Sequence, residues 1–174
     1  VYVSSEYFGN AAYTAIFLLE RGADVNAQDN AGTTPLMLAV KSGSVSGLML
    51  LLEYGADVHQ HDKRGRTALM HATAYGYWRM VATLLDKGCD PDARDNRGRT
   101  ALMQAALAEA PPLTAMSVLL AAGADPDIPD NDGATPLSRA KALNHTAAAN
   151  LLHSYGAKEA QFEKDHGTHG NSTD

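Results

Sequence analysis

The sequence predicts an all-α solenoid of stacked helix–turn–helix units, because three short motifs recur in one register along its 174 residues. The first motif is a Gly-Ala-Asp tripeptide or a close variant of it. Its glycines are Gly22, Gly55, Gly88, Gly123 and Gly156. They are 33 residues apart (55 − 22, 88 − 55, 156 − 123), except for one interval of 35 (123 − 88). A fixed period of this length is typical of architectures in which each unit covers the apolar face of the next.

The second motif marks the start of a helix and reads Thr-Pro-Leu or Thr-Ala-Leu. Its threonines are Thr34, Thr67, Thr100 and Thr135. A threonine hydroxyl at a helix N-cap accepts a hydrogen bond from a free backbone N–H of the first turn. Pro35 and Pro136 follow at the first helical position, where the missing N–H costs nothing. Alanines then allow close packing of this first helix; they are Ala39, Ala72, Ala105 and Ala140.

A second helix with larger apolar residues follows in each unit, and a turn leads on to the next unit. The larger residues are Leu48, Leu51 and Leu52, then Val81, Leu84 and Leu85, then Met116, Leu119 and Leu120. The glycine of the first motif comes after this helix, where it suits a left-handed position. The third motif, Asp-x-x-Gly, then forms the turn; it begins at Asp29, Asp62, Asp95 and Asp130.

Together the three motifs resemble the ankyrin repeat over residues 11–158, which is most of the chain. The resemblance implies an ankyrin-repeat solenoid with projecting β-hairpin-like loops. It also implies a curved, elongated domain that binds other proteins on its concave face and loop tips. The usual His after Thr-Pro-Leu is replaced here by Met37, Met70, Met103 and Ser138.

The register of the motifs divides the chain into six segments. These are a partial or divergent N-terminal repeat (1–28), three repeats (29–61, 62–94 and 95–129), a C-terminal capping repeat (130–158) and a polar tail (159–174). We expect the two extra residues of the third full repeat in its helix–helix loop, at 109–112. In the capping repeat His153 replaces an outer leucine, which suits the polar outer face of a terminal unit. Gly47 lies inside a second helix, where glycine costs about 1 kcal/mol relative to alanine.

Composition excludes several classes of function. The formal net charge is −6, from 20 acidic and 14 basic side chains, which argues against a nucleic-acid-binding protein. A single cysteine, Cys89, allows neither an internal disulfide nor a cysteine-rich zinc site. The longest apolar run has five residues, far short of the roughly 18–20 that a membrane-spanning helix needs. We therefore expect no membrane insertion, a cytoplasmic location and a protein that is monomeric by itself.

No residue pattern indicates catalysis, and no cofactor is predicted. His59 and His61 lie two apart on an extended loop, but no third metal ligand is near them in sequence, so hydrogen bonding on the loop is favoured. Cys89 replaces the alanine of a tightly packed tripeptide, which favours a buried apolar role over a nucleophilic one. The aspartates recur at turn positions, which accounts for them without acid–base chemistry.

Basic and aromatic residues are concentrated in the two central repeats, and we call this set the central strip. Its members are Lys63, Arg64, Arg66, Tyr75, Tyr77, Trp78, Arg94, Arg97 and Arg99. The flanking loops differ, with Asn30, Ala31 and Thr33 on one side and Asn131, Asp132 and Ala134 on the other. Arg, Tyr and Trp dominate binding hot spots, which favours a partner-binding surface. The alternative is that the arginines offset neighbouring aspartates and that Trp78 covers core.

The predicted function is a non-catalytic protein–protein interaction module, an adaptor or scaffold. Its partner is expected to present an acidic segment next to an apolar anchor, with no nucleic acid involved. Two alternatives remain open: a regulatory or inhibitory subunit that occludes an enzyme, and a structural segment of a larger multidomain protein. Within the central strip, Arg66 and Arg99 are expected to be exposed loop charges that matter for binding and not for stability. Stacking is expected to align the arginines along one edge, with the aromatic residues beside it.

Overall fold

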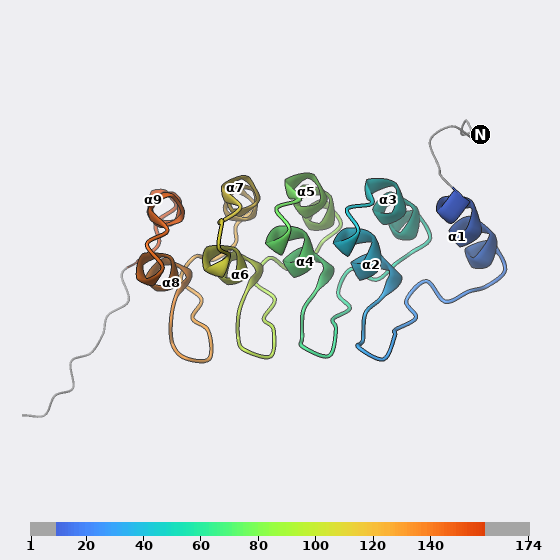
Figure 1. Ribbon diagram of the computed structural model, residues 1–174, viewed down its shortest axis with the longest axis horizontal. Coiled ribbons are helices and arrows are strands. Elements are labelled where there is room, and N and C mark those ends of the chain that lie inside the picture. The colour runs from blue at the N-terminus through green and yellow to red at the C-terminus, as the bar shows by residue number, and fades with distance from the viewer. Residues whose placement is uncertain (1–9, 159–174) are drawn as a thin grey trace, which may run out of the picture.

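The structure, a computed structural model, describes residues 10–158 and consists of two rows of helices and one row of loops (Figure 1). The first helices of the repeats are α2 (Pro35–Lys41), α4 (Ala68–Ala74), α6 (Ala101–Leu107) and α8 (Pro136–Ala142). The second helices are α3 (Val45–Glu53), α5 (Trp78–Asp86), α7 (Leu113–Ala121) and α9 (Thr146–Ser154). Helix α1 (Asn10–Glu20) packs against α3 at one end. Residues 1–9 of the predicted N-terminal unit and the predicted polar tail, 159–174, lie outside the described residues.

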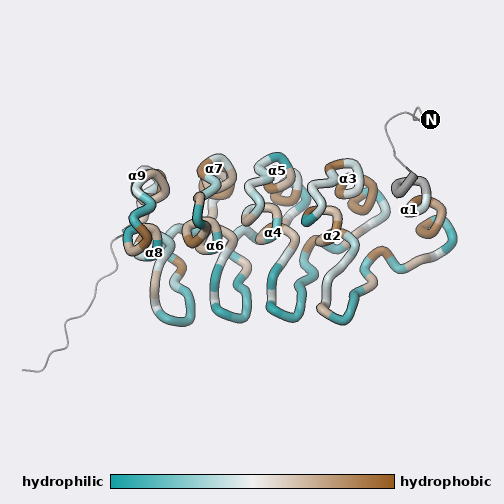
Figure 2. The backbone as a smooth tube through the Cα atoms, in the orientation of Figure 1, coloured by the Kyte–Doolittle hydropathy of each residue, from teal (hydrophilic) through white to brown (hydrophobic). Residues whose placement is uncertain are grey.

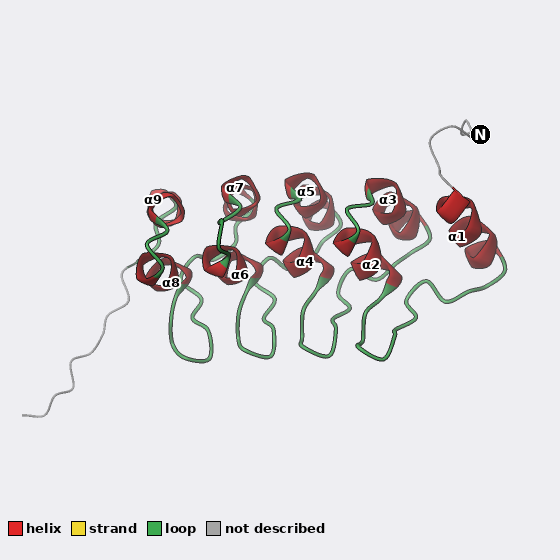
Figure 3. Ribbon diagram, viewed as in Figure 1, coloured by secondary structure: helices red, strands yellow, loops and turns green. Residues whose placement is uncertain are grey.

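The helices pack in the order that a solenoid requires. Each first helix packs against the next, from α2 through α4 and α6 to α8, and each also packs against its own second helix. Residues 10–158 contain helices and loops but no strand (Figure 3). His61 and Thr67 form one isolated antiparallel bridge at the base of a loop. The predicted all-α solenoid with hairpin-like loops is confirmed.

Threonine caps begin all four first helices, as the sequence predicts. The Oγ1 atoms of Thr34 and Thr67 accept hydrogen bonds from the third helical N–H at 3.3 and 3.4 Å. Thr100 and Thr135 do the same at 3.2 Å each. Two of these helices also have proline in the first turn. Such a cap is worth about 1 kcal/mol, so a short first helix depends on it.

The core lies between the two rows of helices. Leucines on the first helices are at most 1% exposed; they are Leu36, Leu69, Leu102 and Leu137. Those on the second helices are fully buried; they are Leu48, Leu84, Leu119 and Leu152. Full burial of one such side chain stabilises the fold by about 1.5–3 kcal/mol. Figure 2 shows hydrophobic residues in the helices and hydrophilic residues along the tips of the loops.

The loops stack on one another through backbone hydrogen bonds between their tips. The N–H of Lys63 donates to the carbonyl of Ala31, and the N–H of Asn96 donates to that of Arg64, both at 2.9 Å. Gly65 has φ of +76°, and a Cβ there would lie 2.8 Å from the backbone nitrogen of Asn96. Only glycine fits this close approach. The equivalent residues of successive loops are therefore held in register.

The helix–helix loop of the third full repeat is longer than the others. It runs over 108–112 between α6 and α7, whereas the corresponding loop between α4 and α5 is 75–77. Its last residue, Pro112, lies over the preceding loop, where a Cβ on Gly76 would be 3.3 Å from the Cβ of Pro112. Tyr77 lies over Gly43 in the same way. The row of helix–helix loops is therefore also in contact from one repeat to the next.

Candidate partner-binding surface

The turn aspartates hold the two central loops in shape. Oδ1 of Asp62 accepts hydrogen bonds from the backbone N–H groups of Arg64 and Arg66, at 2.9 and 3.0 Å. Oδ1 of Asp95 does the same for the corresponding residues of the next loop, at 2.8 and 2.9 Å. Each carboxylate thus closes its own turn from inside. This agrees with the predicted turn role of the recurring aspartates.

The second oxygen of each of these carboxylates binds an arginine. Oδ2 of Asp62 accepts from Nε of Arg66 at 2.9 Å and lies 2.8 Å from its Nη2. Oδ2 of Asp95 accepts from Nε and Nη2 of Arg99 at 3.0 and 2.8 Å. Both aspartates are buried, and the arginines are only about a quarter exposed (27% and 25%). The prediction that Arg66 and Arg99 are exposed loop charges is therefore wrong, because the loop folds back and brings each guanidinium onto a buried carboxylate.

These bonds also set the acidity of the two carboxyl groups. Burial raises the pKa of Asp62, but hydrogen bonds from the backbone and guanidinium of Arg66 outweigh it. Burial raises the pKa of Asp95 as well, and the Arg99 guanidinium outweighs it there. The pKa of each aspartate lies below its ordinary value, so both carboxylates stay charged at neutral pH.

Arg94 is also engaged within the protein. Its Nε donates to the carbonyl of Gly98 at 3.1 Å, and its Nη2 donates to the carbonyl of Pro129 at 3.0 Å. The side chain therefore connects the last residue of the second full repeat to the turn glycine and the last residue of the third. Arg94, like Arg66 and Arg99, has a structural role whether or not it also touches a partner.

Three basic residues of the central strip stay exposed at the loop tips: Lys63, Arg64 and Arg97. Within residues 10–158 their side chains make no hydrogen bond or ion pair. Arg64 and Arg97 precede the turn glycines of adjacent loops, and their carbonyls accept equivalent hydrogen bonds from the following loop. We call these three residues the basic tips.

The aromatic residues of the central strip lie at the other end of α4. Tyr75 and Tyr77 stack with ring centroids 5.7 Å apart, and Tyr75 is 53% exposed. Trp78 is 42% exposed, with the guanidinium of Arg79 5.0 Å from its ring centroid. Seven helical residues span about 10 Å, which separates these rings from the loops. The expectation that they lie directly beside the arginine edge is therefore wrong, because α4 intervenes.

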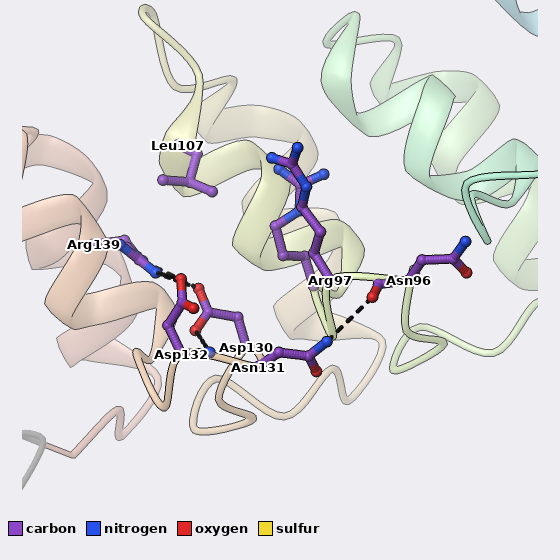
Figure 4. Close-up of a pocket in the computed structure, with 8 residues that line it drawn as sticks. Asn96, Arg97, Leu107, Asp130, Asn131, Asp132 and Arg139 are labelled. Atoms are coloured by element: carbon purple, nitrogen blue, oxygen red, sulfur yellow. Dashed lines mark hydrogen bonds and ion pairs between the residues drawn. The ribbon is translucent and has the colours of Figure 1, made fainter.

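A pocket of about 620 Å³ opens between the third and fourth loops (Figure 4). It is lined by Asn96, Arg97, Arg99, Leu107, Asp130, Asn131, Asp132 and Arg139. Arg139 of α8 binds Oδ2 of Asp130 through Nε and Nη2, at 3.1 and 2.8 Å, and Oδ2 of Asp132 at 2.9 Å. In Figure 4 Arg97 stands on the opposite side of this space from Arg139. Three guanidinium groups thus line one pocket.

Of the pocket residues, only Arg97 and Arg99 were predicted from the sequence as binding residues; those missed are Asn96, Leu107, Asp130, Asn131, Asp132 and Arg139. One signal could have identified Arg139. The fourth loop has Ala134 where the two central loops have the arginine that holds the aspartate. Arg139 lies in the next helix and supplies the missing guanidinium to Asp130 from nine residues away. The signal is particular to this loop, because Asp29 of the first loop, where Thr33 takes the same place, binds no arginine among the described residues.

His71 is buried beneath the loop of the second full repeat. It is 4% exposed, and within the described residues its Nε2 makes no hydrogen bond, lying 3.4 Å from Oδ2 of Asp62. Burial, reinforced by the charges of Arg66 and Lys41, lowers its pKa to about 4. The equivalent residue one repeat later, Gln104, donates to Oδ2 of its aspartate at 3.2 Å. His71 is therefore a neutral packing residue at neutral pH.

The other residues considered for metal binding or catalysis are His59, His61 and Cys89. His59 is exposed, and Nδ1 of His61 lies 3.2 Å from the carbonyl of Asp62. Among residues 10–158 no group of three or more His, Cys, Asp or Glu side chains is placed to hold a metal ion. Cys89 is 6% exposed, and burial raises the pKa of its thiol to about 12, so the thiol is protonated and unreactive. Over the same residues no helix is long and apolar enough to cross a membrane.

Comparisons with known proteins agree with this architecture. Residues 3–95 and 79–163 match the family described as ankyrin repeats (3 copies). The crystal structure of an ankyrin repeat domain from Acinetobacter baumannii AYE is similar, with 36% sequence identity and a TM-score of 0.78. That match covers 84% of this chain and 76% of the other. A search of curated proteins finds no match.

The chain belongs to the ankyrin-repeat family, because the family match extends over most of its length. Ankyrin repeats are generally protein–protein interaction modules, and the fold is typically non-catalytic.

Proposed function

We propose that this chain is a non-catalytic adaptor or scaffold that binds a protein partner along the loop tips and first helices of its central repeats. The observation that carries this proposal is the set of basic tips, Lys63, Arg64 and Arg97, which are exposed and have no intramolecular side-chain partner among the described residues. A chain of formal charge −6 concentrates these charges on adjacent loops. Cations that stabilise nothing within the fold are available to a partner.

Several acidic residues, by contrast, accept hydrogen bonds within the protein. Oδ1 of Asp92 accepts a hydrogen bond from the backbone of Asp125 at 2.9 Å, and Oδ1 of Asp127 accepts one from Lys158 at 2.8 Å. These aspartates join one repeat to the next. The basic tips concentrate positive charge on two adjacent loops, and such a local charge speeds the association of an acidic partner.

An apolar contact is available on the same repeat. Tyr75 and Trp78 are about half exposed at the end of α4 that is distant from the tips. Trp78 also lines a shallow groove of about 250 Å³ with Val45 and Arg79. A partner segment longer than the roughly 10 Å of α4 could present acidic residues to the tips and an apolar anchor to these rings.

The test is affinity capture with matched charge variants. Arg64→Glu/Arg97→Glu reverses two basic tips. Arg21→Glu/Lys87→Glu makes the same change in net charge at two exposed residues that directly follow α1 and α5, away from the basic tips. Thermal melting first establishes that all the proteins are folded. Captured proteins are then identified by mass spectrometry at several salt concentrations.

The expected result is a partner retained by the wild type and by the Arg21/Lys87 variant but lost from the Arg64/Arg97 variant. Its retention should fall as salt screens the tips. If the captured partner is an enzyme and binding inhibits it, the chain is a regulatory or inhibitory subunit. Equal retention of every captured protein by both variants would refute the proposal and favour the structural-segment alternative.

A further inference from the structure

The two acidic residues of the pocket between the third and fourth loops are held very differently. Asp130 is buried, and its carboxylate accepts hydrogen bonds from two backbone N–H groups and from Arg139. The side chain of Asp132 is 82% exposed, and within the described residues its carboxylate bonds only to Nη2 of Arg139, at 2.9 Å. Asp130 is thus part of the fold, whereas Asp132 is a loosely held occupant of the pocket.

The bond between Asp132 and Arg139 is easily exchanged. Ion pairs with one such exposed member typically change an equilibrium constant by only about 1.5- to 5-fold. Replacing Asp132 on Arg139 with another carboxylate therefore costs little. The same replacement at Asp130 would break a buried network and is not expected.

The pocket offers further donors to an incoming carboxylate. Arg97 has no side-chain partner within residues 10–158. Arg99 and Arg139 bind their aspartates through Nε and Nη2, which leaves Nη1 of each without a hydrogen bond inside the described part of the chain. Leu107 adds one half-buried apolar side chain to the lining. Guanidinium groups bind carboxylates with good geometry, so the lining suits an acidic side chain with an apolar neighbour.

We propose that this pocket receives an acidic side chain of the protein partner, whose carboxylate displaces Asp132 from Arg139 and also binds Arg97. An apolar residue next to it in the partner contacts Leu107. Asp132 is then an internal competitor that weakens the interaction. This inference rests on the proposed function, since it specifies how the same surface recognises its partner.

A peptide titration followed by NMR tests the pocket directly, using the Nε–Hε signals of the arginines. The probe is acetyl-Ala-Glu-Leu-Ala-amide, and the control peptide has Gln in place of Glu. Asp132→Asn removes the competitor, and Asp86→Asn removes an exposed carboxylate from the end of α5 as its match. Arg97→Gln removes a pocket cation, and Arg64→Gln removes the equivalent residue one loop earlier.

The expected result is that Asp132→Asn tightens binding of the glutamate peptide by about 1.5- to 5-fold. Arg97→Gln should weaken binding by about threefold or more and Arg64→Gln, one loop away, by clearly less, whereas Asp86→Asn leaves it unchanged. The signals of Arg97 and Arg139 should shift more than that of Arg64. The glutamine peptide should not bind at comparable concentrations.

Three outcomes would overturn the inference: no saturable binding by the wild type or Asp132→Asn, equal effects of Arg97→Gln and Arg64→Gln, or equal gains from Asp132→Asn and Asp86→Asn. Equal gains from Asp132→Asn and Asp86→Asn would show that the loss of any negative charge strengthens binding, and that Asp132 is not a specific competitor. If the pocket fails but partner capture still depends on Arg64 and Arg97, the proposed function survives without it. If the peptide binds as expected but no partner is captured, the pocket binds carboxylates, and the proposed function fails together with the role of the pocket in partner binding.

Discussion

The guanidinium of Arg66 binds the buried carboxylate of Asp62 through two nitrogens, with Nε and Nη2 at 2.9 and 2.8 Å from Oδ2. The residue two positions earlier, Arg64, extends into solvent from the same turn. The turn thus divides its arginines into two kinds. The one before the turn glycine faces outward, and the one after it faces the carboxylate; Arg97 and Arg99 repeat this arrangement in the next loop.

Reversing the charge of Arg66 should destabilise the protein. Arg66→Glu removes hydrogen bonds to a charged group, worth about 1.5–3 kcal/mol, and adds repulsion against Asp62. Arg64→Glu, at an exposed tip, should change the free energy of unfolding by less than about 0.5 kcal/mol. Urea unfolding measures both. Equal stability of the two variants would mean that the Asp62 pair contributes nothing to the fold.

Sequence reasoning succeeded wherever one residue has one local task. Thr67 as a cap and Gly88 after a helix with positive φ follow from the backbone conformation that each position needs. Contacts between side chains that the folded loops and helices bring together were not visible in the sequence pattern. Arg99 reaches its aspartate only because the loop reverses, and Arg139 reaches another from the following helix. Whether the central strip binds a partner stays a prediction, since partner contacts leave no mark on the fold.

Acid should weaken the fold through His71. The pKa of His71 is about 4 in the folded protein and near 6.5 in the unfolded chain. Between those values the unfolded chain binds a proton that the folded one does not. This contribution is complete above pH 6.5 and is lost as the pH falls toward 4, by up to about 3 kcal/mol.

His71→Gln should remove this acid sensitivity. Glutamine occupies the equivalent position in the next repeat, where Gln104 donates to Asp95 at 3.2 Å. The variant should make the same bond to Asp62. Its free energy of unfolding should stay constant from pH 6.5 to 4.5, apart from changes that other titrating groups cause in the wild type as well. Urea unfolding across this range, with His153→Gln as the exposed control, measures the difference. Parallel pH profiles for wild type and His71→Gln would contradict the assignment.

His59→Asn should stabilise the contact between the first and second full repeats. At equivalent positions Asn26 accepts from the backbone of Asp57 at 2.8 Å, and Asp92 accepts from that of Asp125 at 2.9 Å. Within the described residues His59 makes no such bond to Asp90. Asparagine there should add about 0.5–1.5 kcal/mol.

Thermal and urea unfolding of His59→Asn test this, with His59→Ala as the control. Alanine removes the imidazole without supplying an acceptor, so it should not stabilise. An equal gain from both variants would attribute the effect to loss of histidine and not to a new hydrogen bond.

Gly47 and Ser44 should be energetically coupled. Ser44 caps α3, its Oγ accepting from the N–H of Gly47 at 3.1 Å. A Cβ on Gly47 would lie 2.9 Å from that same Oγ and 3.4 Å from the Cβ of Ala39. Gly47→Ala gains about 1 kcal/mol in helix propensity. It also displaces a cap worth about 1 kcal/mol.

In the wild type these effects should nearly cancel, so the gain of up to about 1 kcal/mol expected from propensity alone is not realised. In the Ser44→Ala background no cap remains to be lost, and Gly47→Ala should then stabilise by about 1 kcal/mol. A double-mutant cycle from urea unfolding gives the coupling directly, with an expected value near 1 kcal/mol. The same gain in both backgrounds would show that the serine hydroxyl moves aside without loss. A destabilisation in both would instead identify contact with Ala39 as the reason for glycine at this position.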